Sequence, residues 1–527
     1  MIATDLTVVI PTRDRWSVLD RTLTALRSQT APGFEIIVVV DGEDQVVPAL
    51  PGVRVVQVPH GGPGAARNAG AANATTDLLL FLGDDMIPRP GLVAAHLAQH
   101  SRRKDVVDAV LGHVDWHPEV PRTPLRDWID ARGMQFDYRS MLGDDAGWSR
   151  FYSCNVSLKR ALFDAVDGFD PDFAYYYEDL DAGWRLGEQG MRLRYEPAAA
   201  ADHLHAYEEA KYAKRMRGVA AGERMMAAKH PWFTPWFAAR FQAVESLEPL
   251  PSLWRRLPTL PVKAVQQRTA QAWTTRFAPD FLDAYEGAEE LEELKAYLGG
   301  SYDEARLQGH QHLVDAEEHA APDELTFYRT SQAYLYDLTV FAMSGTKRPY
   351  RRQVRRLAPD RGRVLDYGCG IGSDGLRLTE AGLQVDYADF ANPSVDYLRW
   401  RLGRRGLEAR IHDVEADVPG GYDLVYCFDV IEHVDDPFGF LRVLEERADL
   451  VVVNFLEPTP EDVHVHKPLD VPALMDHVIG QGLVSYRRYH GRSHLVAYRP
   501  GTAGRADQLT ARAKIARDRL RQPRARA

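Results

Sequence analysis

Cysteine is scarce in this chain of 527 residues. Cys154, Cys369 and Cys427 are far apart in the sequence and form no CxxC pair. Such spacing is typical neither of a disulfide framework nor of a thiolate zinc site, so it indicates a protein of a reducing compartment.

Long apolar runs are also missing. No stretch reaches the roughly 18–20 apolar residues that cross a bilayer, and the first residues lead into a strand pattern instead of a signal peptide. The formal net charge of −11 argues against a general nucleic-acid binder, because such proteins usually present a basic face. We therefore expect a cytoplasmic protein, with at most peripheral contact at the inner face of the membrane.

Short β-branched runs alternate with helical patterns in two stretches, the first over residues 1 to about 205 and the second from Arg363 onward. Such alternation predicts parallel sheets with covering helices. The expected fold class is therefore α/β, with two Rossmann-like doubly wound domains joined by a helical region. The predicted segments are a first domain (1–230), a helical linker (231–322), a second domain (323–500) and a basic tail (501–527).

Two segments outside the strand patterns have unusual composition. WFTPWFAARF (232–241) concentrates aromatic residues, and the segment after Gly501 is basic. The first is interpreted either as a helix that packs on the first sheet or as a stretch that rests on a membrane surface. The second is expected to be a solvated, frayed terminus.

Carboxylates follow two apolar strands of the first stretch. Asp41 ends FEIIVVVD, and Asp84 and Asp85 end DLLLFLGDD. Ligands bind at the carboxyl edge of open α/β sheets, where paired carboxylates suit a hard cation such as Mg²⁺ or Mn²⁺. The alternative is that these residues form ordinary turns or helix caps.

Three blocks within residues 6–205 resemble the family 2 glycosyltransferases, which have the GT-A fold. They begin IPTRDRWSVLD, HGGPGAARNAG and CNVSLKRALFD, and they occur in the family's order. The resemblance implies that a sugar is transferred, with inversion, from a nucleoside diphosphate donor of UDP, dTDP or GDP type. The acceptor would be a glycan or glycoconjugate, lipid-linked acceptors included.

The same resemblance assigns a metal site. Mn²⁺ or Mg²⁺ would be held by Asp84, Asp85 and His203, with His205 as the fallback for the histidine. The motif here reads Gly-Asp-Asp, which leaves open which carboxylate touches the metal. A purely structural histidine is the alternative for His203.

The resemblance also names catalytic and nucleotide-binding residues. Asp179 would be the base that deprotonates the acceptor hydroxyl, with Glu178 beside it. An ordinary acidic helix start is the alternative for both residues. The residues expected to bind the nucleotide sugar are Pro11, Thr12, Arg13, Asp41, Arg67, Asn68, Asp84 and Arg185.

A glycine-rich turn opens the second stretch. RVLDYGCGIGSDG allows a tight turn and a close backbone approach to a ligand, but nicotinamide enzymes use a similar turn. The strands that follow the turn indicate which ligand it binds. Asp389 closes the next strand, where its carboxylate can accept both hydroxyls of a ribose, and Asp413 follows the third strand at the height of an adenine.

These blocks and YDLVYCFDVIEHVDDP resemble class I S-adenosylmethionine-dependent methyltransferases, and DVIEHV is similar to the segment in small-molecule O-methyltransferases of ubiquinone biosynthesis. The resemblance implies S-adenosylmethionine as cofactor. For the base on the methyl acceptor, His433 is the first candidate, followed by His464 and His466. The residues expected to bind the cofactor are Asp366, Gly368, Gly370, Gly372, Asp389, Phe390, Asp413, Val414, Asp429 and Val430.

The sequence therefore predicts a bifunctional, glycan-modifying enzyme of polysaccharide or glycoconjugate biosynthesis. One head would transfer a sugar, and the other would O-methylate a sugar hydroxyl, on the same product in the simplest case. Two alternatives remain. The two activities serve unrelated substrates of one pathway, or one head is inactive and acts as a binding or scaffold module.

Overall fold

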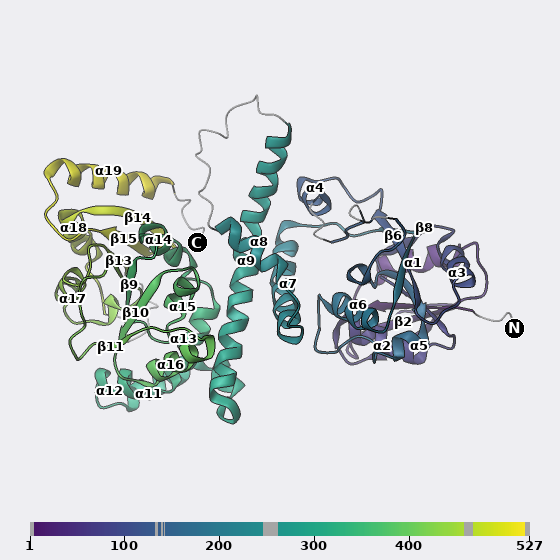
Figure 1. The fold of residues 1–527 in the computed structure, drawn as a ribbon, viewed down its shortest axis with the longest axis horizontal. Coiled ribbons are helices and arrows are strands. Elements are labelled where there is room, and N and C mark those ends of the chain that lie inside the picture. The colour runs from purple at the N-terminus through teal and green to yellow at the C-terminus, as the bar shows by residue number, and fades with distance from the viewer. Residues whose placement is uncertain are drawn as a thin grey trace. The chain divides into compact units, whose positions relative to one another are not determined.

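A computed structural model describes residues 5–131, 135–138, 141, 143–245, 262–457 and 467–521. Contacts divide the chain into two compact units, Met1–Tyr285 and Glu286–Ala527, and each unit contains one sheet with helices packed against it (Figure 1). The predicted α/β class with two Rossmann-like sheets is confirmed. The division falls inside the segment 231–322, so the predicted linker contributes to both units.

The sheet of the first unit has the strand order β3-β2-β1-β4-β7-β6-β8-β5. Strand β1 pairs in parallel with β2 and β4, whereas β7 runs antiparallel to β4 and β6. Parallel pairing brings the carboxyl ends of β1, β2 and β4 to one edge. The strands are β1 (Thr7–Thr12), β2 (Glu35–Asp41), β3 (Arg54–Val58), β4 (Leu78–Leu82), β5 (Met86–Pro88), β6 (Asp108–Trp116), β7 (Asn155–Lys159) and β8 (Arg192–His203).

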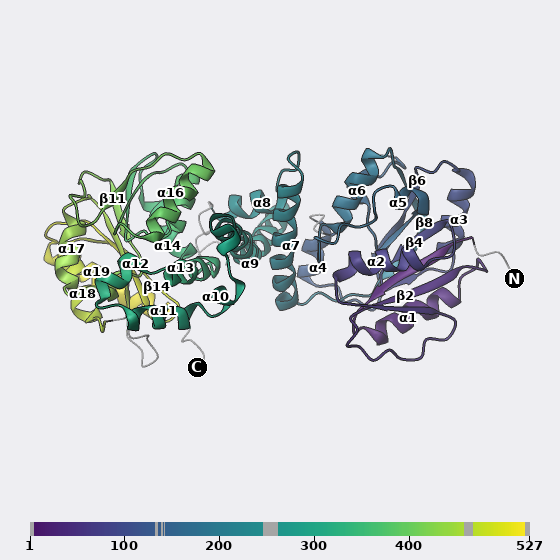
Figure 2. The ribbon, with the colours of Figure 1, turned by 90° about the horizontal axis from the view of Figure 1, so that it is seen from below.

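Helices cover both faces of this sheet (Figure 2). Buried side chains of α1 and α3 form a core on one face, and those of α2, α5 and α6 form a core on the other. Strands such as LLLFL in β4 are apolar throughout because both faces are buried. The helices are α1 (Trp16–Arg27), α2 (Gly62–Asn73), α3 (Leu92–Arg102), α4 (Pro124–Ala131), α5 (Arg160–Asp164) and α6 (Glu178–Glu188).

Three further helices, α7 (Glu209–Lys229), α8 (Trp236–Glu245) and α9 (Val262–Leu298), follow the first sheet. Within the first unit they form a separate apolar cluster with α4, in which Ala238 and Phe241 of α8 are buried. The predicted packing of WFTPWFAARF on the sheet is therefore wrong. Its apolar face meets helices instead, because α7 and α9 offer aromatic partners such as Phe281.

Glu223 of α7 holds this helical cluster together. Its carboxylate accepts hydrogen bonds from the backbone N–H groups of Trp236, Phe237 and Ala238 at the start of α8, and from the hydroxyl of Tyr177 at 2.9 Å. A buried carboxylate that accepts several hydrogen bonds is strongly stabilised, and its donors lose their partner when it is removed.

We therefore expect Glu223→Ala to lower the free energy of unfolding of the first unit by about 3 kcal/mol, since hydrogen bonds to a charged group contribute roughly 1.5–3 kcal/mol. Tryptophan fluorescence during urea unfolding measures this, because every tryptophan except Trp400 lies in residues 1–285. Glu208→Ala is the matched control, since Glu208 is exposed and forms an ion pair with the exposed Lys211. Equal unfolding curves for the two variants would contradict the expectation.

The sheet of the second unit has the order β11-β10-β9-β12-β13-β15-β14. Its first five strands are parallel, and β15 runs antiparallel to both β13 and β14. The carboxyl ends of β9, β10 and β12 therefore meet at one edge. The strands are β9 (Arg363–Tyr367), β10 (Gln384–Asp389), β11 (Ile411–Asp413), β12 (Leu424–Cys427), β13 (Val451–Leu456), β14 (Leu483–Tyr489) and β15 (Ser493–Tyr498).

Helices also cover both faces of the second sheet. The chain enters this unit through the C-terminal part of α9, which contacts α15 and α16 through the ion pairs Arg377–Glu289 and Arg401–Glu293. The helices are α10 (Glu304–Gln308), α11 (His310–Ala320), α12 (Glu324–Thr330), α13 (Ala333–Met343), α14 (Arg348–Leu357), α15 (Ser373–Glu380), α16 (Pro393–Arg405), α17 (Pro437–Glu445), α18 (Val471–Gln481) and α19 (Arg505–Arg521).

The C-terminal segment is ordered up to Arg521, so the expected frayed terminus is wrong for residues 505–521. It forms α19, in which Ala511 and Ile515 are one helical turn apart and are buried in the core of the second unit. The Nζ of Lys514 donates to the carbonyl of Val484 in β14 at 2.7 Å. The basic composition of this segment did not indicate that Ala511 and Ile515 form a narrow apolar stripe.

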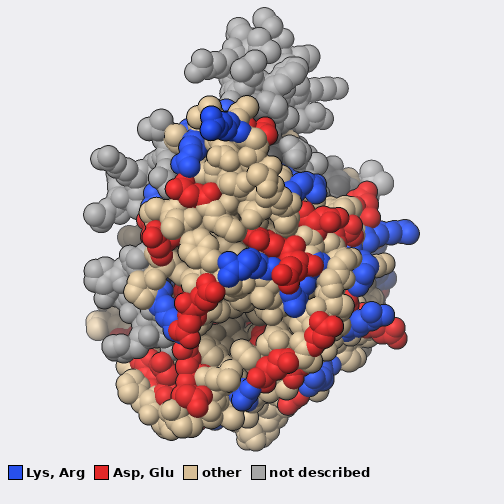
Figure 3. Space-filling view, turned by 90° about the vertical axis from the view of Figure 1, so that its left-hand side faces the viewer, with Lys and Arg blue, Asp and Glu red and all other residues tan. Residues whose placement is uncertain are grey.

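No helix in the described part of the chain combines the length and the apolarity needed to cross a membrane. On the face of the second unit that Figure 3 shows, acidic and basic side chains are interspersed, and the surface is hollowed near the middle. This face shows no continuous basic patch of the kind that binds nucleic acid.

Candidate functional sites

The first unit contains a cavity of about 1500 Å³ at the carboxyl edge of its sheet. Residues at the ends of β1, β2 and β4 line it, together with residues of α6, α7 and α8. Ten residues selected from the sequence lie in its wall: Pro11, Thr12, Arg13, Asp41, Arg67, Asp84, Asp85, Glu178, Asp179 and His203.

Two of the selected residues, Asn68 and Arg185, are not among those that line this cavity. Asn68 donates to the carbonyl of Phe169 and accepts from its N–H, at 2.7 and 2.8 Å. Arg185 donates to Asp181 and to the carbonyl of Gly168. Both side chains therefore hold the segment that leads to α6 in place.

Asp41 lies at the end of β2 and faces the N-terminus of α2. Its oxygens accept from the N–H groups of Gly61 and Gly62 at 2.8 and 3.2 Å, and His60 Nδ1 lies 2.9 Å from Oδ2. A Cβ on Gly62 would lie 1.9 Å from the carbonyl oxygen of Ala174, so this close approach requires glycine. The strand end and the helix start thus form one wall of the cavity.

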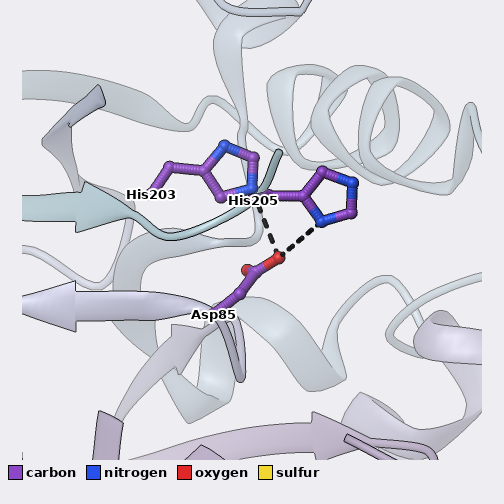
Figure 4. Close-up of side chains that lie close together, drawn as sticks. All are labelled: Asp85, His203 and His205. Atoms are coloured by element: carbon purple, nitrogen blue, oxygen red, sulfur yellow. Dashed lines mark hydrogen bonds and ion pairs between the residues drawn. The ribbon is translucent and has the colours of Figure 1, made fainter. Parts of the chain in front are cut away.

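Asp85, His203 and His205 form a cluster of potential metal ligands, with ligand atoms within 4.8 Å of one another (Figure 4). His203 Nε2 and His205 Nδ1 lie 3.3 and 3.5 Å from the same oxygen, Asp85 Oδ2. Two imidazoles beside a carboxylate suit Mn²⁺ better than Mg²⁺, which prefers oxygen ligands. The donor set therefore fits a divalent transition-metal ion.

Asp84 stands outside this cluster, although the sequence grouped it with the metal ligands. Its Oδ2 accepts from the Thr12 hydroxyl at 2.8 Å, and its Oδ1 lies 2.8 Å from Arg15 Nη1. The second guanidinium nitrogen of Arg15 lies 2.7 Å from Asp85 Oδ2. Arg15 therefore bridges both carboxylates. The sequence analysis did not select this residue, and its position at the end of PTRDR was the only signal for it.

The pKa values of the two neighbouring carboxyl groups are shifted in opposite directions. Burial, together with the charge of Asp85, raises the pKa of Asp84 to about 6. Burial would also raise the pKa of Asp85, but His203, His205 and Arg15 hold it well below its usual range. Asp85 is therefore the firmly ionised carboxylate of the two.

Glu178 and Asp179 open α6 after a strained turn. Tyr176 and Tyr177, directly before them, have φ angles of 63° and 68°, a left-handed conformation that costs non-glycine residues of order 1–3 kcal/mol each. Such strain persists only where the surrounding contacts enforce it, here the bond from Tyr177 to Glu223. It aims the two carboxylates into the cavity.

The two carboxylates differ in their contacts. Asp179 Oδ2 accepts from the N–H of Ser153 at 3.0 Å, whereas its Oδ1 is buried and has no hydrogen-bond partner among the described residues. Burial and the charge of Asp179 raise the pKa of Glu178 to about 7, and Arg67 Nη1 lies 3.5 Å from Glu178 Oε1. Burial raises the pKa of Asp179 as well, against the effect of Arg67.

The second unit contains a cavity of about 740 Å³ at the carboxyl edge of its own sheet. Eight residues selected from the sequence line it: Gly368, Gly370, Asp389, Phe390, Val414, Asp429, Val430 and His433. Three others, Asp366, Gly372 and Asp413, are not among the lining residues. Burial raises the pKa of Asp366, at the end of β9, to about 8.

Asp389 holds the glycine-rich turn. Its Oδ2 accepts from the N–H of Gly370 at 2.7 Å, and its Oδ1 from the N–H of Phe390 at 2.8 Å. Each oxygen retains a further lone pair for a ligand hydroxyl. Gly368 has a φ of 75°, and a Cβ there would lie 2.5 Å from the side chain of Val430, so this position requires glycine.

Asp429 and His433 lie on the opposite wall. Asp429 has a φ of 55° and is fixed by two hydrogen bonds with the fully buried amide of Asn454, at 2.9 and 2.7 Å. His433 Nδ1 lies 2.9 Å from the hydroxyl of Tyr328 on α12. The sequence analysis did not select Tyr328. The other two candidates for the base, His464 and His466, lie outside the described residues.

Glu432, between these residues in the sequence, is buried, and neither of its carboxyl oxygens has a hydrogen-bond partner among the described residues. Burial, with the charge of Asp429, raises its pKa to about 8. The folded state therefore holds a proton that the unfolded chain releases near its ordinary pKa of 4.5. The stability from this group is full below that value and is lost as the pH rises through about 8.

We expect the second unit of the wild-type protein to lose stability between about pH 5 and pH 8, and Glu432→Gln to lose less, because the amide has no proton to release. The raised pKa of Asp366 remains in both proteins, so the variant's profile is flatter but not flat. Hydrogen exchange of β12 and β13 amides, corrected for intrinsic rates, measures this. Parallel profiles for both proteins would show that Glu432 does not titrate in this range.

Two known families match separate parts of the chain. Residues 7–166 match the family described as Glycosyl transferase family 2, and residues 344–474 match the family described as Methyltransferase domain. The first match covers the strands that form the edge of the first cavity. The second covers the glycine-rich turn and the wall that carries His433.

Individual relatives divide in the same way. The pre-mycofactocin glycosyltransferase of Mycobacterium tuberculosis (strain CDC 1551 / Oshkosh) is 32% identical over 237 residues, 43% of this chain and 48% of that protein. The validoxylamine A glucosyltransferase of Streptomyces hygroscopicus subsp. limoneus is 34% identical over 224 residues, 36% of this chain and 49% of that protein. The ubiquinone biosynthesis O-methyltransferase of Bordetella pertussis is 35% identical over 91 residues, 16% of this chain and 38% of that protein. The chain thus spans about half the length, or less, of these relatives.

Proposed function

We propose that the chain, which carries a family 2 glycosyltransferase domain followed by a methyltransferase domain as its sequence predicted, is a bifunctional enzyme. The first head transfers a sugar, with inversion, from a nucleoside diphosphate donor to a glycoconjugate acceptor. The second head transfers a methyl group from S-adenosylmethionine to a sugar hydroxyl. Each reaction has its own cavity in its own unit.

One observation carries the first half of the proposal. A single cavity contains a carboxylate oxygen, Asp179 Oδ1, that has no hydrogen-bond partner among the described residues, and a cluster of potential metal ligands that includes Asp85 and His203. Inverting transfer needs a base on the side of the acceptor and a positive charge on the side of the leaving diphosphate. Asp179 takes the proton of the acceptor hydroxyl, and the N–H of Ser153 keeps its other oxygen in place.

The residues of the metal cluster would hold Mn²⁺ through Asp85, His203 and His205. When bound, the cation offsets the negative charge of the diphosphate. Asp41 and Arg13 lie on the same wall, where Arg13 donates to the carbonyl of Asp41 at 2.8 Å. We assign the nucleoside to this wall, next to the N-terminus of α2.

In the second cavity we assign the ribose to Asp389 and the methionine end to the turn at Gly368 and Gly370. Bound S-adenosylmethionine supplies an electrophilic methyl group. His433 takes the proton of the acceptor hydroxyl, and Tyr328 orients its ring through Nδ1. Leu338 and Phe341 of α13 add an aliphatic and an aromatic side chain to the wall of this cavity.

The relatives suggest the acceptor class for the first head. Two of them are named for a pre-mycofactocin and for validoxylamine A, so we propose a glycosylated small molecule or peptide ahead of a polysaccharide. Covalent linkage raises the local concentration of the second head around the product of the first. Methylation of the newly added sugar is therefore the simplest coupling.

A donor panel tests the proposal. Purified full-length protein is incubated with Mn²⁺, UDP-, dTDP- or GDP-sugars, candidate acceptors and S-adenosylmethionine that carries a labelled methyl group, and products are analysed by mass spectrometry. We expect a product whose added sugar carries the labelled methyl. A label found only on an unrelated molecule would separate the two activities, and binding of both nucleotides without turnover would favour the scaffold alternative.

A further inference from the structure

Arg215 of α7 lines the first cavity, and among the described residues no carboxylate forms an ion pair with it, although the charge of Glu178 acts on it from a longer distance. Its Nη1 donates to the hydroxyl of Tyr207 at 3.2 Å. Its Nε is buried and has no hydrogen-bond partner in the described part of the chain. The guanidinium group is otherwise held by aromatic faces, with its Cζ 5.1 Å from the centre of the Tyr176 ring and 5.7 Å from that of Tyr207.

Arg215 is half-buried, whereas the fully buried Arg401 has acidic partners. The guanidinium of Arg401 lies 2.8 Å from Glu290 and 2.7 Å from Glu293. A guanidinium removed from water without a counter-charge is unfavourable, and stacking on aromatic rings compensates only in part. Because no carboxylate among the described residues forms an ion pair with Arg215, its guanidinium can bind an anion that a ligand supplies.

The neighbours of Arg215 indicate which anion. Tyr207, which accepts its hydrogen bond, packs against His205 of the metal cluster with ring centres 4.8 Å apart. Tyr176, its other aromatic partner, precedes the Glu178–Asp179 pair by two residues. Arg215 is thus connected to the metal ligands on one side and to the acidic pair on the other. In the proposed reaction, the donor's diphosphate occupies the space between these groups.

We propose that Arg215 is a further catalytic residue, which binds the diphosphate of the sugar donor and stabilises the charge that develops on it. This inference rests on the proposed glycosyl transfer. As the acceptor oxygen forms its bond to the anomeric carbon, the bond from that carbon to the phosphate oxygen breaks, and its electron pair stays on the phosphate. The acceptor's proton passes to Asp179. Arg215 then donates to the oxygen that has gained charge.

The family resemblance does not assign this residue, because the three blocks that carry it lie within residues 6–205. It comes instead from α7, which Glu223 ties to the strained turn before α6 through Tyr177. Since Arg215 and Glu223 are two helical turns apart on α7, the same helix carries the cation and anchors the acidic pair. The helix therefore completes a site that the sheet edge only begins.

Binding of nucleotides separates this role from a structural one. UDP and UMP are titrated calorimetrically, with Mn²⁺, into wild-type protein, Arg215→Gln and Arg215→Lys; dTDP or GDP with its monophosphate replaces the pair if the wild type prefers it. We expect Arg215→Gln to weaken binding of the diphosphate about tenfold and to leave the monophosphate, which lacks the second phosphate, unchanged. Sugar transfer should fall about 10²–10³-fold, the usual loss for a transition-state donor, with partial recovery in Arg215→Lys.

Lys214→Gln is the matched control, because Lys214 is the exposed neighbour on the same helix. Equal weakening of diphosphate and monophosphate, or a higher KM for the acceptor with unchanged diphosphate binding, would overturn the proposal; the second result would assign the anion to the acceptor. Active wild-type protein with an equally active Arg215→Gln variant would refute this inference alone. Wild-type protein that neither binds a nucleoside diphosphate nor transfers sugar would refute the proposed function itself.

Discussion

Replacing Asp179 with asparagine should lower the rate of sugar transfer about 10³-fold and leave methyl transfer to a supplied glycoside unchanged. The asparagine oxygen can still accept the hydrogen bond from the N–H of Ser153, so the local fold is preserved. The side chain, however, can no longer take a proton, and a positioned general base contributes about 10²–10⁴-fold to a rate. Asp179 Oδ1, which has no partner among the described residues, is the atom that the substitution disables.

Release of nucleoside diphosphate measures the first activity, and formation of S-adenosylhomocysteine measures the second. Glu188→Gln is the matched control, since Glu188 is exposed at the end of the same helix. Glu178→Gln tests the neighbour and should lose less activity than Asp179→Asn, because Glu178 faces Arg67. Retention of more than a tenth of the wild-type rate by Asp179→Asn would exclude Asp179 as the base.

The sequence predicted those parts of both sites that depend on strand ends. Asp41, Asp85 and Asp389 each end or follow an apolar strand, and the parallel order of the strands brings such residues to one edge of a sheet. The strand–helix alternation predicted the parallel pairing of these strands, but it did not predict the antiparallel strands β7 and β15. The two cavities were therefore predictable in place, although the fine geometry within them was not.

Residues that reach a site from another element carried no such signal. Arg15 follows β1 and bridges Asp84 and Asp85, and Tyr328 approaches His433 from a helix 105 residues earlier in the chain. The sequence also did not indicate that His205 lies beside Asp85 and His203 in the cluster of potential metal ligands. Asp84 instead forms an ion pair with Arg15. Which of two adjacent side chains faces a cavity depends on tertiary packing.

Replacing Asp389 with alanine should weaken the binding of S-adenosylmethionine about 10²-fold or more and leave sugar transfer unchanged. Hydrogen bonds to a charged group contribute roughly 1.5–3 kcal/mol each, and the proposed contact to the ribose makes two of them. The substitution also removes the acceptor for the N–H groups of Gly370 and Phe390, which loosens the turn. Both effects act on cofactor binding in the same direction.

Calorimetry with S-adenosylhomocysteine on the full-length protein measures this loss. Asp396→Ala is the matched control, because Asp396 is exposed on α16 and forms an ion pair with the exposed Arg399. If Asp389→Ala bound S-adenosylhomocysteine within a few-fold of the wild-type affinity, the assignment of the ribose to Asp389 would be wrong.

Asp389→Ala and Asp179→Asn together also decide whether the two heads act on one product. If methylation follows sugar transfer, Asp389→Ala should accumulate the unmethylated glycoside. Asp179→Asn should then form no methylated product until the purified glycoside is added, because its second cavity remains intact. If the heads serve unrelated substrates, each variant should lose one product and form the other at the wild-type rate. The asymmetric pattern requires a shared product, since only a shared product makes the second reaction depend on the base of the first.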